Sequence, residues 1–125
     1  MTDQMRIATF NLENLDDGVD VKPPLAERIK IMRPQLERVS ADIICLQEIN
    51  SQGSDGGRTL SALDQLLNNT DYAGFEKQTT LTTSGQLYDQ RNLVTLSRFH
   101  IITTKLIRDN MGPQPSYKMA TADPP

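Results

Sequence analysis

The sequence has little of what many small domains use to build a core or a catalytic centre. Its 125 residues include no tryptophan, three phenylalanines, three tyrosines, one cysteine and one histidine. A single cysteine excludes an internal disulfide framework and a zinc site built from several thiolates. We therefore expect an aliphatic core in which Cys45 packs as a small apolar side chain.

Long apolar runs and a strong net charge are also absent. No stretch is long enough to span a membrane, and residues 2–4 are polar, without the apolar region of a signal peptide. These features predict a cytoplasmic chain with no membrane partner. The formal net charge of −3 gives no general attraction to nucleic acid. Bound metal ions or a local basic patch would still allow a nucleic-acid substrate.

The central apolar run, residues 42–50, predicts a strand whose carboxyl end carries Gln47 and Glu48. Its isoleucines favour an extended chain, and a continuous apolar run is typical of a strand buried on both faces. From these residues alone two readings of Glu48 stay open. It is either the first solvated residue after the strand or a carboxylate that holds a hard cation such as Mg²⁺.

An earlier stretch, residues 5–15, predicts a second strand with one apolar face and one polar face. Alternation places three side chains on the apolar face: Ala8, Phe10 and Leu12. The opposite face becomes polar toward Asn11 and Glu13. The two strands lie about thirty residues apart, which suits a β-α-β crossover with both carboxyl ends at one edge of the sheet.

The remaining pattern predicts two helical regions and further strands. An apolar stripe over residues 25–39 predicts a helix, with a kink or a restart expected near Arg33 and Pro34. Thr59 is a candidate N-cap for a helix that reaches residue 68, with three leucines facing inward: Leu60, Leu63 and Leu67. Strands are predicted over residues 72–80, 92–97 and 101–107, the last two either as antiparallel neighbours or on the two sides of a sharp sheet corner.

Three segments, in order, resemble successive motifs of one known family. They are residues 9–15 (TFNLENL), 41–48 (ADIICLQE) and 91–99 (RNLVTLSRF). This series resembles the endonuclease/exonuclease/phosphatase superfamily, whose fold is that of pancreatic-type deoxyribonuclease. The resemblance implies an α/β chain that is part of a four-layer α/β/β/α sandwich with two central sheets.

The resemblance also implies that the chain is incomplete as a catalyst. Residues 1–107 would form the N-terminal half of the domain, and residues 108–125, which contain proline and glycine, would form an irregular tail leading to a missing C-terminal half. The family's Asp-x-Asn and Ser-Asp-His motifs, which carry its general base, have no counterpart here. A sheet face that the second half covers would be left open, which predicts dimerisation or poor solubility.

The implied function is divalent-metal-dependent hydrolysis of a phosphoester bond, with Mg²⁺ or Mn²⁺ as cofactor and a phosphate ester, nucleic acid among the candidates, as substrate. Glu48 matches the family's metal-binding glutamate. Asn11 matches the asparagine that binds or orients the metal and the scissile phosphate. Glu13 either joins the metal site or is a surface carboxylate. The alternative is a non-catalytic split or degenerate member that binds a metal or complements a partner.

Three other polar residues are interpreted as structural. Gln47 is expected to point away from Glu48 and to make a structural hydrogen bond. Asn92 is expected to support the third motif. His100, the only histidine, lies in a predicted turn and is interpreted as a turn residue rather than a general base.

Overall fold

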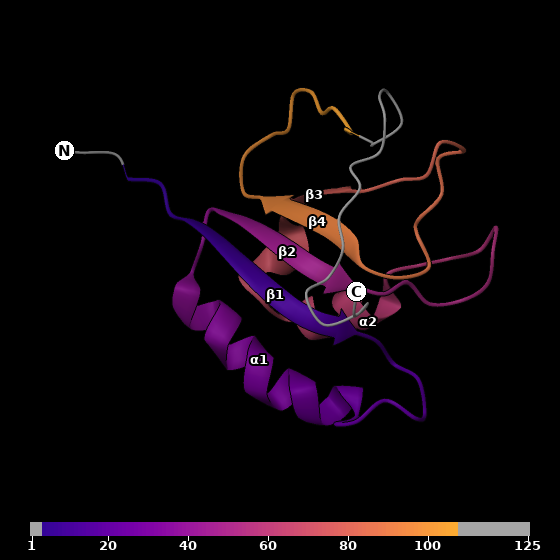
Figure 1. The fold of residues 1–125 in the computed structure, drawn as a ribbon. Helices are drawn as coiled ribbons and strands as arrows, with labels where there is room; N and C mark the ends of the chain where they lie inside the picture. Colours follow the sequence, from indigo (N-terminus) through magenta and orange to yellow (C-terminus); the bar gives the residue numbers. More distant parts are fainter. Residues whose placement is uncertain (1–3, 108–125) are drawn as a thin grey trace, which may run out of the picture.

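The computed structural model describes residues 4–107, which form one mixed sheet with two helices packed against it (Figure 1). The elements in chain order are β1 (Ile7–Leu15), α1 (Leu25–Val39), β2 (Ile43–Ile49), α2 (Ser61–Leu67), the 3-10 turn η1 (Asp71–Gly74), β3 (Glu76–Thr79) and β4 (Asn92–Ser97). The tail predicted for residues 108–125 lies outside the described residues. Within them, no helix is long and apolar enough to cross a membrane.

The sheet has the strand order β1-β2-β4-β3. β1 and β2 are parallel, with Asn11 opposite Gln47, and α1 connects them. β4 then pairs antiparallel with β2 and with β3. The predicted crossover is therefore confirmed, and the carboxyl ends of β1 and β2 lie at the same edge of the sheet (Figure 1).

Both helices cover one face of the sheet. The apolar stripe of α1 is buried at Leu25, Met32 and Leu36, against leucine and isoleucine side chains from the strands and from α2. In β1, Leu12 is fully buried while Thr9 and Asn11 are exposed, so the predicted alternation is confirmed.

The second face of the sheet is only partly covered within the described residues. In β2 the side chains of Ile44 and Leu46 are buried, whereas Ile43 and Cys45 are half-buried. The prediction that β2 is buried on both faces is therefore wrong for the described residues, because both helices pack on the same side. We call this second side the open face.

The predicted restart at Pro34 does not occur, because α1 runs through it as one helix, while the alternative of a kink stays a prediction. Proline removes one helical N–H and clashes with the preceding turn. Pro34 lies on the exposed side of α1. There, the carbonyl group that loses its partner can bond to water, so the in-phase apolar stripe keeps the helix continuous.

The residue that caps the start of α2 is not the predicted Thr59. Thr59 pairs with Gln52 through backbone hydrogen bonds and does not cap the helix. The Oε1 atom of Gln52 instead accepts a hydrogen bond from the N–H of Ala62, 2.8 Å away. The leucines expected on the buried side of this region are buried: Leu60, Leu63 and Leu67.

Two strand predictions need correction. Residues 72–80 contain the turn η1 before the short strand β3, and the side chain of Tyr72 enters the core. Residues 101–107 form no strand. Both edges of β4 are already paired, to β2 and β3, so no edge is free for a further neighbour.

Candidate metal centre at the carboxyl ends of β1 and β2

Backbone irregularities mark one edge of the sheet. In β1 and β2 the pairing moves from Asn11 opposite Gln47 to Leu15 opposite Ile49, so β1 holds the extra residues of a bulge. A second register shift separates β2 from β4 at the same edge. Bulges occur often beside active sites, because they redirect side chains at the end of a strand.

Four residues at this edge adopt a left-handed backbone conformation. They are Glu13 (φ 47°), Asn14 (φ 55°), Glu48 (φ 59°) and Arg91 (φ 58°). Such angles are uncommon for residues with a side chain, and clusters of them occur at functional sites. They come from β1, β2 and the residue before β4, which are adjacent in the sheet.

The side chains of Asn11 and Glu48 meet at this edge. The Nδ2 of Asn11 donates a hydrogen bond to Oε2 of Glu48, 2.6 Å away. The Oδ1 of Asn11 accepts a hydrogen bond from the backbone N–H of Glu13 at 2.8 Å. The two bonds agree on the orientation of the amide, since a carboxylate requires a donor and an N–H requires an acceptor.

The bulge explains why Glu48 reaches Asn11. Regular alternation would carry Glu48 to the helix-covered face, together with Leu46. The left-handed conformation of Glu48 interrupts that alternation, and its carboxylate contacts a side chain from the exposed side of β1. The expectation that Gln47 and Glu48 point to opposite faces assumed a regular strand, and the bulge removes that assumption.

Glu13 takes part through its backbone. Its N–H bonds to Asn11, and its carbonyl oxygen accepts a hydrogen bond from Nη1 of Arg28 at 3.2 Å. Arg28 also donates to the carbonyl oxygen of Leu12. Among the described residues the carboxylate of Glu13 has no hydrogen-bond or ion-pair partner, so its predicted metal role stays a prediction.

The donor set at this edge suits a hard cation that keeps most of its water. Within residues 4–107 there is no group of three or more histidine, cysteine, aspartate or glutamate side chains that could enclose a metal. Mg²⁺ binds commonly through one or two carboxylates and several waters. Glu48 supplies one carboxylate, and its Oε1 has no partner among the described residues.

Asn11 fits the role of an orienting residue more directly than that of a ligand. Its amide nitrogen faces Glu48, and its oxygen already accepts the Glu13 N–H. A hydrogen bond of this kind fixes the direction of a ligating carboxylate. The sequence resemblance left both roles for Asn11, and the geometry favours the positioning role.

A polar network behind the edge was not predicted. Asp16 accepts hydrogen bonds from Asn50 at 3.1 Å and from Gln52 at 3.2 Å. The Oδ1 of Asn50 accepts a hydrogen bond from the N–H of Arg91 at 3.0 Å. The only sequence signal for this network is the acidic run around Asp16, and the partners of Asp16 lie 34 and 36 residues away in the sequence.

The buried side chain of Asn92 is structural, as expected. Its Nδ2 donates to the carbonyl oxygens of Ile49 at 3.0 Å and Tyr88 at 2.9 Å. Its Oδ1 accepts hydrogen bonds from the Tyr88 N–H and the Thr80 hydroxyl. Asn92 therefore fixes the start of β4 beside the end of β2.

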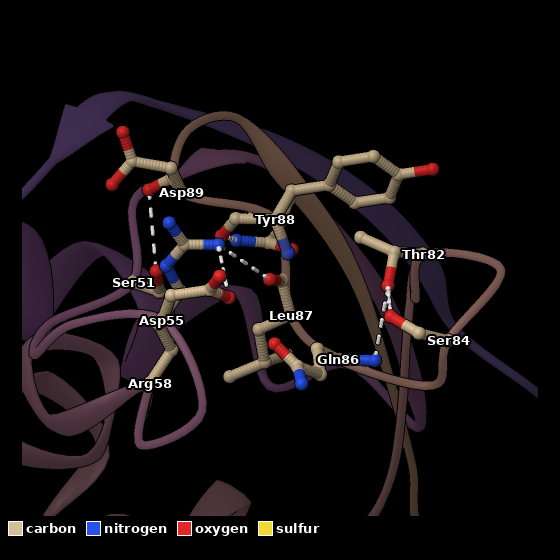
Figure 2. A network of polar contacts seen from close by, with 10 residues as sticks. Ser51, Asp55, Arg58, Thr82, Ser84, Gln86, Leu87, Tyr88 and Asp89 are labelled. Carbon is tan, nitrogen blue, oxygen red and sulfur yellow. Dashed lines mark hydrogen bonds and ion pairs between the residues drawn. The ribbon is translucent and has the colours of Figure 1, made fainter.

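Two loops flank the site and are tied together (Figure 2). Ser51 donates to the carbonyl oxygen of Asp89 from its backbone N–H and its hydroxyl. Arg58 donates to the carbonyl oxygen of Leu87 at 3.4 Å and lies 3.9 Å from a carboxylate oxygen of Asp55. The contacts of Ser51 with Asp89 and of Arg58 with Leu87 join the loop after β2 to the loop before β4.

His100 lies at the opposite end of β4 from this edge. Its Nδ1 is 3.1 Å from the carboxylate of Glu76, whose Oε1 also accepts the Ile101 N–H at 3.0 Å. The Ile101 N–H and the His100 side chain lower the pKa of the Glu76 carboxyl group. His100 therefore helps to fix the chain after β4.

A cavity of about 540 Å³ lies apart from the candidate centre. It is bounded by the open face at Ile43, Leu93 and Thr95 and by residues of the segment 101–107. Neither Asn11 nor Glu48 lines it. The chemistry at the edge and the hollow on the open face are separate features.

Comparison with known proteins finds no relative of this chain. No protein-family model, no curated protein and no solved structure matches the chain. The structure shows a mixed α/β chain with a bulged sheet edge, where Asn11 orients the carboxylate of Glu48.

Proposed function

We propose that this chain supplies the metal-holding edge of a divalent-metal-dependent phosphoesterase. The observation that carries the proposal is the 2.6 Å hydrogen bond from Asn11 to Glu48. It joins the two residues that the sequence resemblance singles out, from strands that are neighbours in the sheet. Mg²⁺ is the proposed cofactor, with Mn²⁺ as a substitute, and a phosphate ester is the substrate.

Each of the three candidate site residues has a defined part in this proposal. Glu48 holds the cation through its carboxylate, and Asn11 keeps that carboxylate in one orientation. Glu13 fixes the Asn11 amide through its backbone N–H, and its carboxylate is a further candidate ligand. A bound divalent cation supplies charge neutralisation at the phosphoryl group and lowers the pKa of a bound water.

The proposal extends to the fold around the site. Residues 1–107 form the first half of a deoxyribonuclease-like domain, and the open face takes the second sheet of a four-layer α/β/β/α sandwich. The exposed apolar residues on that face support this arrangement. Ile7 is 63% exposed and Leu93 is 53% exposed. A second copy of the chain would bury the same face.

A second candidate function is metal or partner binding without turnover. The observation that favours it is the position of His100, the only histidine, at the opposite end of β4 from Glu48. A general base must lie within hydrogen-bond reach of the attacking water. In this alternative the chain binds the cation and complements a partner that carries the base.

The test measures metal binding and turnover on the same samples. Mg²⁺ and Mn²⁺ are titrated calorimetrically into the wild type, Glu48→Gln and Glu37→Gln. Glu37 is an exposed carboxylate on α1 without a partner among the described residues, so Glu37→Gln is the matched control. Hydrolysis of a nitrophenyl phosphodiester and of a nitrophenyl phosphomonoester is then followed with each metal.

We expect Glu48→Gln to weaken metal binding at least about 10-fold, while Glu37→Gln binds as the wild type does. Metal-dependent hydrolysis that disappears in Glu48→Gln supports the phosphoesterase. Metal binding without hydrolysis supports the non-catalytic candidate. Equal metal affinity in the wild type and Glu48→Gln contradicts both.

A further inference from the structure

Arg91 stands at the bulged edge, immediately before β4. Its backbone is left-handed, with φ 58°. The N–H of Arg91 donates to Oδ1 of Asn50, the residue that follows β2, at 3.0 Å. A left-handed backbone is sterically unfavourable for arginine, whereas glycine adopts it readily. The surrounding network nevertheless holds it there.

The side chain of Arg91 reaches across the end of β2. Its Nε lies 3.4 Å from Oδ1 of Asn14, in the bulge of β1. Since β2 lies between β1 and β4 in the sheet, a side chain that joins β1 to the start of β4 must pass the carboxyl end of β2. Glu48 lies at that end. The guanidinium group and the candidate metal ligand therefore share one edge.

The positive charge of Arg91 is not neutralised by an acid among the described residues. Arg98 pairs with Asp42, and Arg58 lies near Asp55. Arg91 has the neutral amide of Asn14 as its side-chain partner, through Nε. Its two terminal nitrogens have no partner among the described residues.

Two half-buried arginines, Arg28 and Arg33, use their guanidinium groups on backbone carbonyl oxygens. Arg28 donates to the bulge of β1, and Arg33 donates to the end of α2. Arg91 differs because it is exposed and keeps two donors in a fixed plane. A guanidinium group with two free donors matches two oxygens of a phosphate or carboxylate.

We propose that Arg91 is the anion anchor of this site and binds two non-bridging oxygens of a phosphate group beside the cation held by Glu48. This inference rests on the proposed function for its substrate class. It adds the residue that fixes the phosphate. Asn14 acts as a positioning residue, because its amide oxygen holds the Nε of Arg91.

The test uses inorganic phosphate and phenyl phosphate as probes, titrated without a divalent metal at constant ionic strength and followed by NMR. The main variant is Arg91→Gly, because glycine accepts the left-handed backbone while the guanidinium group is removed. Arg91→Lys keeps the charge without the planar pair of donors. Arg38→Gln is the control, since Arg38 is exposed on α1 and without a partner among the described residues.

We expect Arg91→Gly to weaken the binding of both probes about 10-fold, Arg91→Lys to lie between it and the wild type, and Arg38→Gln to match the wild type. A thermal unfolding scan should show Arg91→Gly folded. If Arg91→Gly binds phosphate as the wild type does, or if Arg38→Gln loses as much affinity, Arg91 is not the anchor.

The outcome for Arg91 is separable from the outcome for the metal site. Unchanged phosphate binding in Arg91→Gly, together with metal binding lost in Glu48→Gln, overturns the anchor and keeps the phosphoesterase proposal. Phosphate binding lost in Arg91→Gly, with metal binding unchanged in Glu48→Gln, keeps an anion site at Arg91 and overturns the metal site.

Discussion

The hydroxyl group of Tyr72 donates a hydrogen bond to the carbonyl oxygen of Leu36, 2.8 Å away in the last turn of α1. The same hydroxyl accepts a hydrogen bond from the N–H of Ala41 at 2.9 Å. Tyr72 is buried, so one side chain satisfies two backbone groups between α1 and β2.

Replacing Tyr72 with phenylalanine should destabilise the fold without changing its shape. The ring still fills the core, but the Ala41 N–H loses its partner and the Leu36 carbonyl oxygen keeps only the Ser40 N–H, 3.3 Å away. Leaving a buried backbone donor unsatisfied costs about 2 kcal/mol of unfolding free energy. Urea unfolding measures the change. Tyr88→Phe is the control, because the Tyr88 hydroxyl has no partner among the described residues. An equal loss in both variants would contradict the role of the Tyr72 hydroxyl.

Replacing Pro34 with alanine should stabilise α1. Alanine restores a helical N–H donor for the carbonyl group of Lys30 and removes the clash of the ring, which is worth roughly 1–3 kcal/mol in an exposed helix interior. The expected result is a higher unfolding free energy, with Gln35→Ala unchanged. A lower unfolding free energy for Pro34→Ala would mean that α1 needs the shape that Pro34 imposes.

Acid should destabilise the fold through Asp42. Its Oδ2 accepts the Arg6 N–H at 2.8 Å, and Arg98 lies 2.9 Å from Oδ1. The Arg6 N–H and then the Arg98 side chain lower the pKa of the Asp42 carboxyl group in the folded protein. The stabilisation is therefore complete above the unfolded-state pKa, near about 4, and is lost as the pH falls through the lower folded-state value.

Urea unfolding at pH 7 and pH 3 tests this dependence. Asp42→Asn should show a smaller loss of unfolding free energy between the two pH values than the wild type. Asp20→Asn should show the wild-type loss, because Asp20 is an exposed loop residue without a partner among the described residues. If Asp42→Asn loses as much unfolding free energy between pH 7 and pH 3 as the wild type does, the contacts of Asp42 do not contribute to the acid sensitivity.

The open face should make the isolated chain associate. Ile7 and Leu93 are more than half exposed on strands of this face. Sedimentation should show concentration-dependent association of the wild type, reduced in Ile7→Thr/Leu93→Thr. Val19→Thr is the control, because Val19 is 99% exposed in a loop. A compact monomer at all concentrations would contradict association of the chain through the open face.

Local pattern was enough to predict the part of the fold that carries the candidate centre. A β-α-β crossover is predicted by the alternation in β1, the apolar run of β2 and the apolar stripe of α1. This crossover brings Asn11 and Glu48 to one edge of the sheet. These signals are strong because side-chain periodicity reports directly which face is buried.

The features that local pattern missed depend on partners far away in the sequence. Gln52 caps α2 in place of Thr59, and Asp16 holds Asn50 from a loop that reads as solvated. The segment 101–107 has the composition of a strand, but no edge is free beside β4. Propensity cannot show which sheet edges are already occupied.

The bulged edge is the feature of the candidate site that local sequence pattern does not predict. Neither Glu48 nor Arg91 belongs to a residue type that favours a left-handed backbone, so the sequence gives no sign of this conformation. Regular strand geometry would have placed Glu48 on the face of the sheet opposite to Asn11. The irregular backbone is what turns the Glu48 carboxylate toward Asn11.

Mn²⁺ is the most direct probe of the central claim, because it broadens NMR signals of nuclei close to its binding site. We predict that substoichiometric Mn²⁺ broadens the side-chain amide signals of Asn11 and the backbone signals of Glu48 first. The effect should vanish in Glu48→Gln and persist in Glu37→Gln. Broadening centred elsewhere, or unchanged in Glu48→Gln, would contradict the metal centre proposed for this edge.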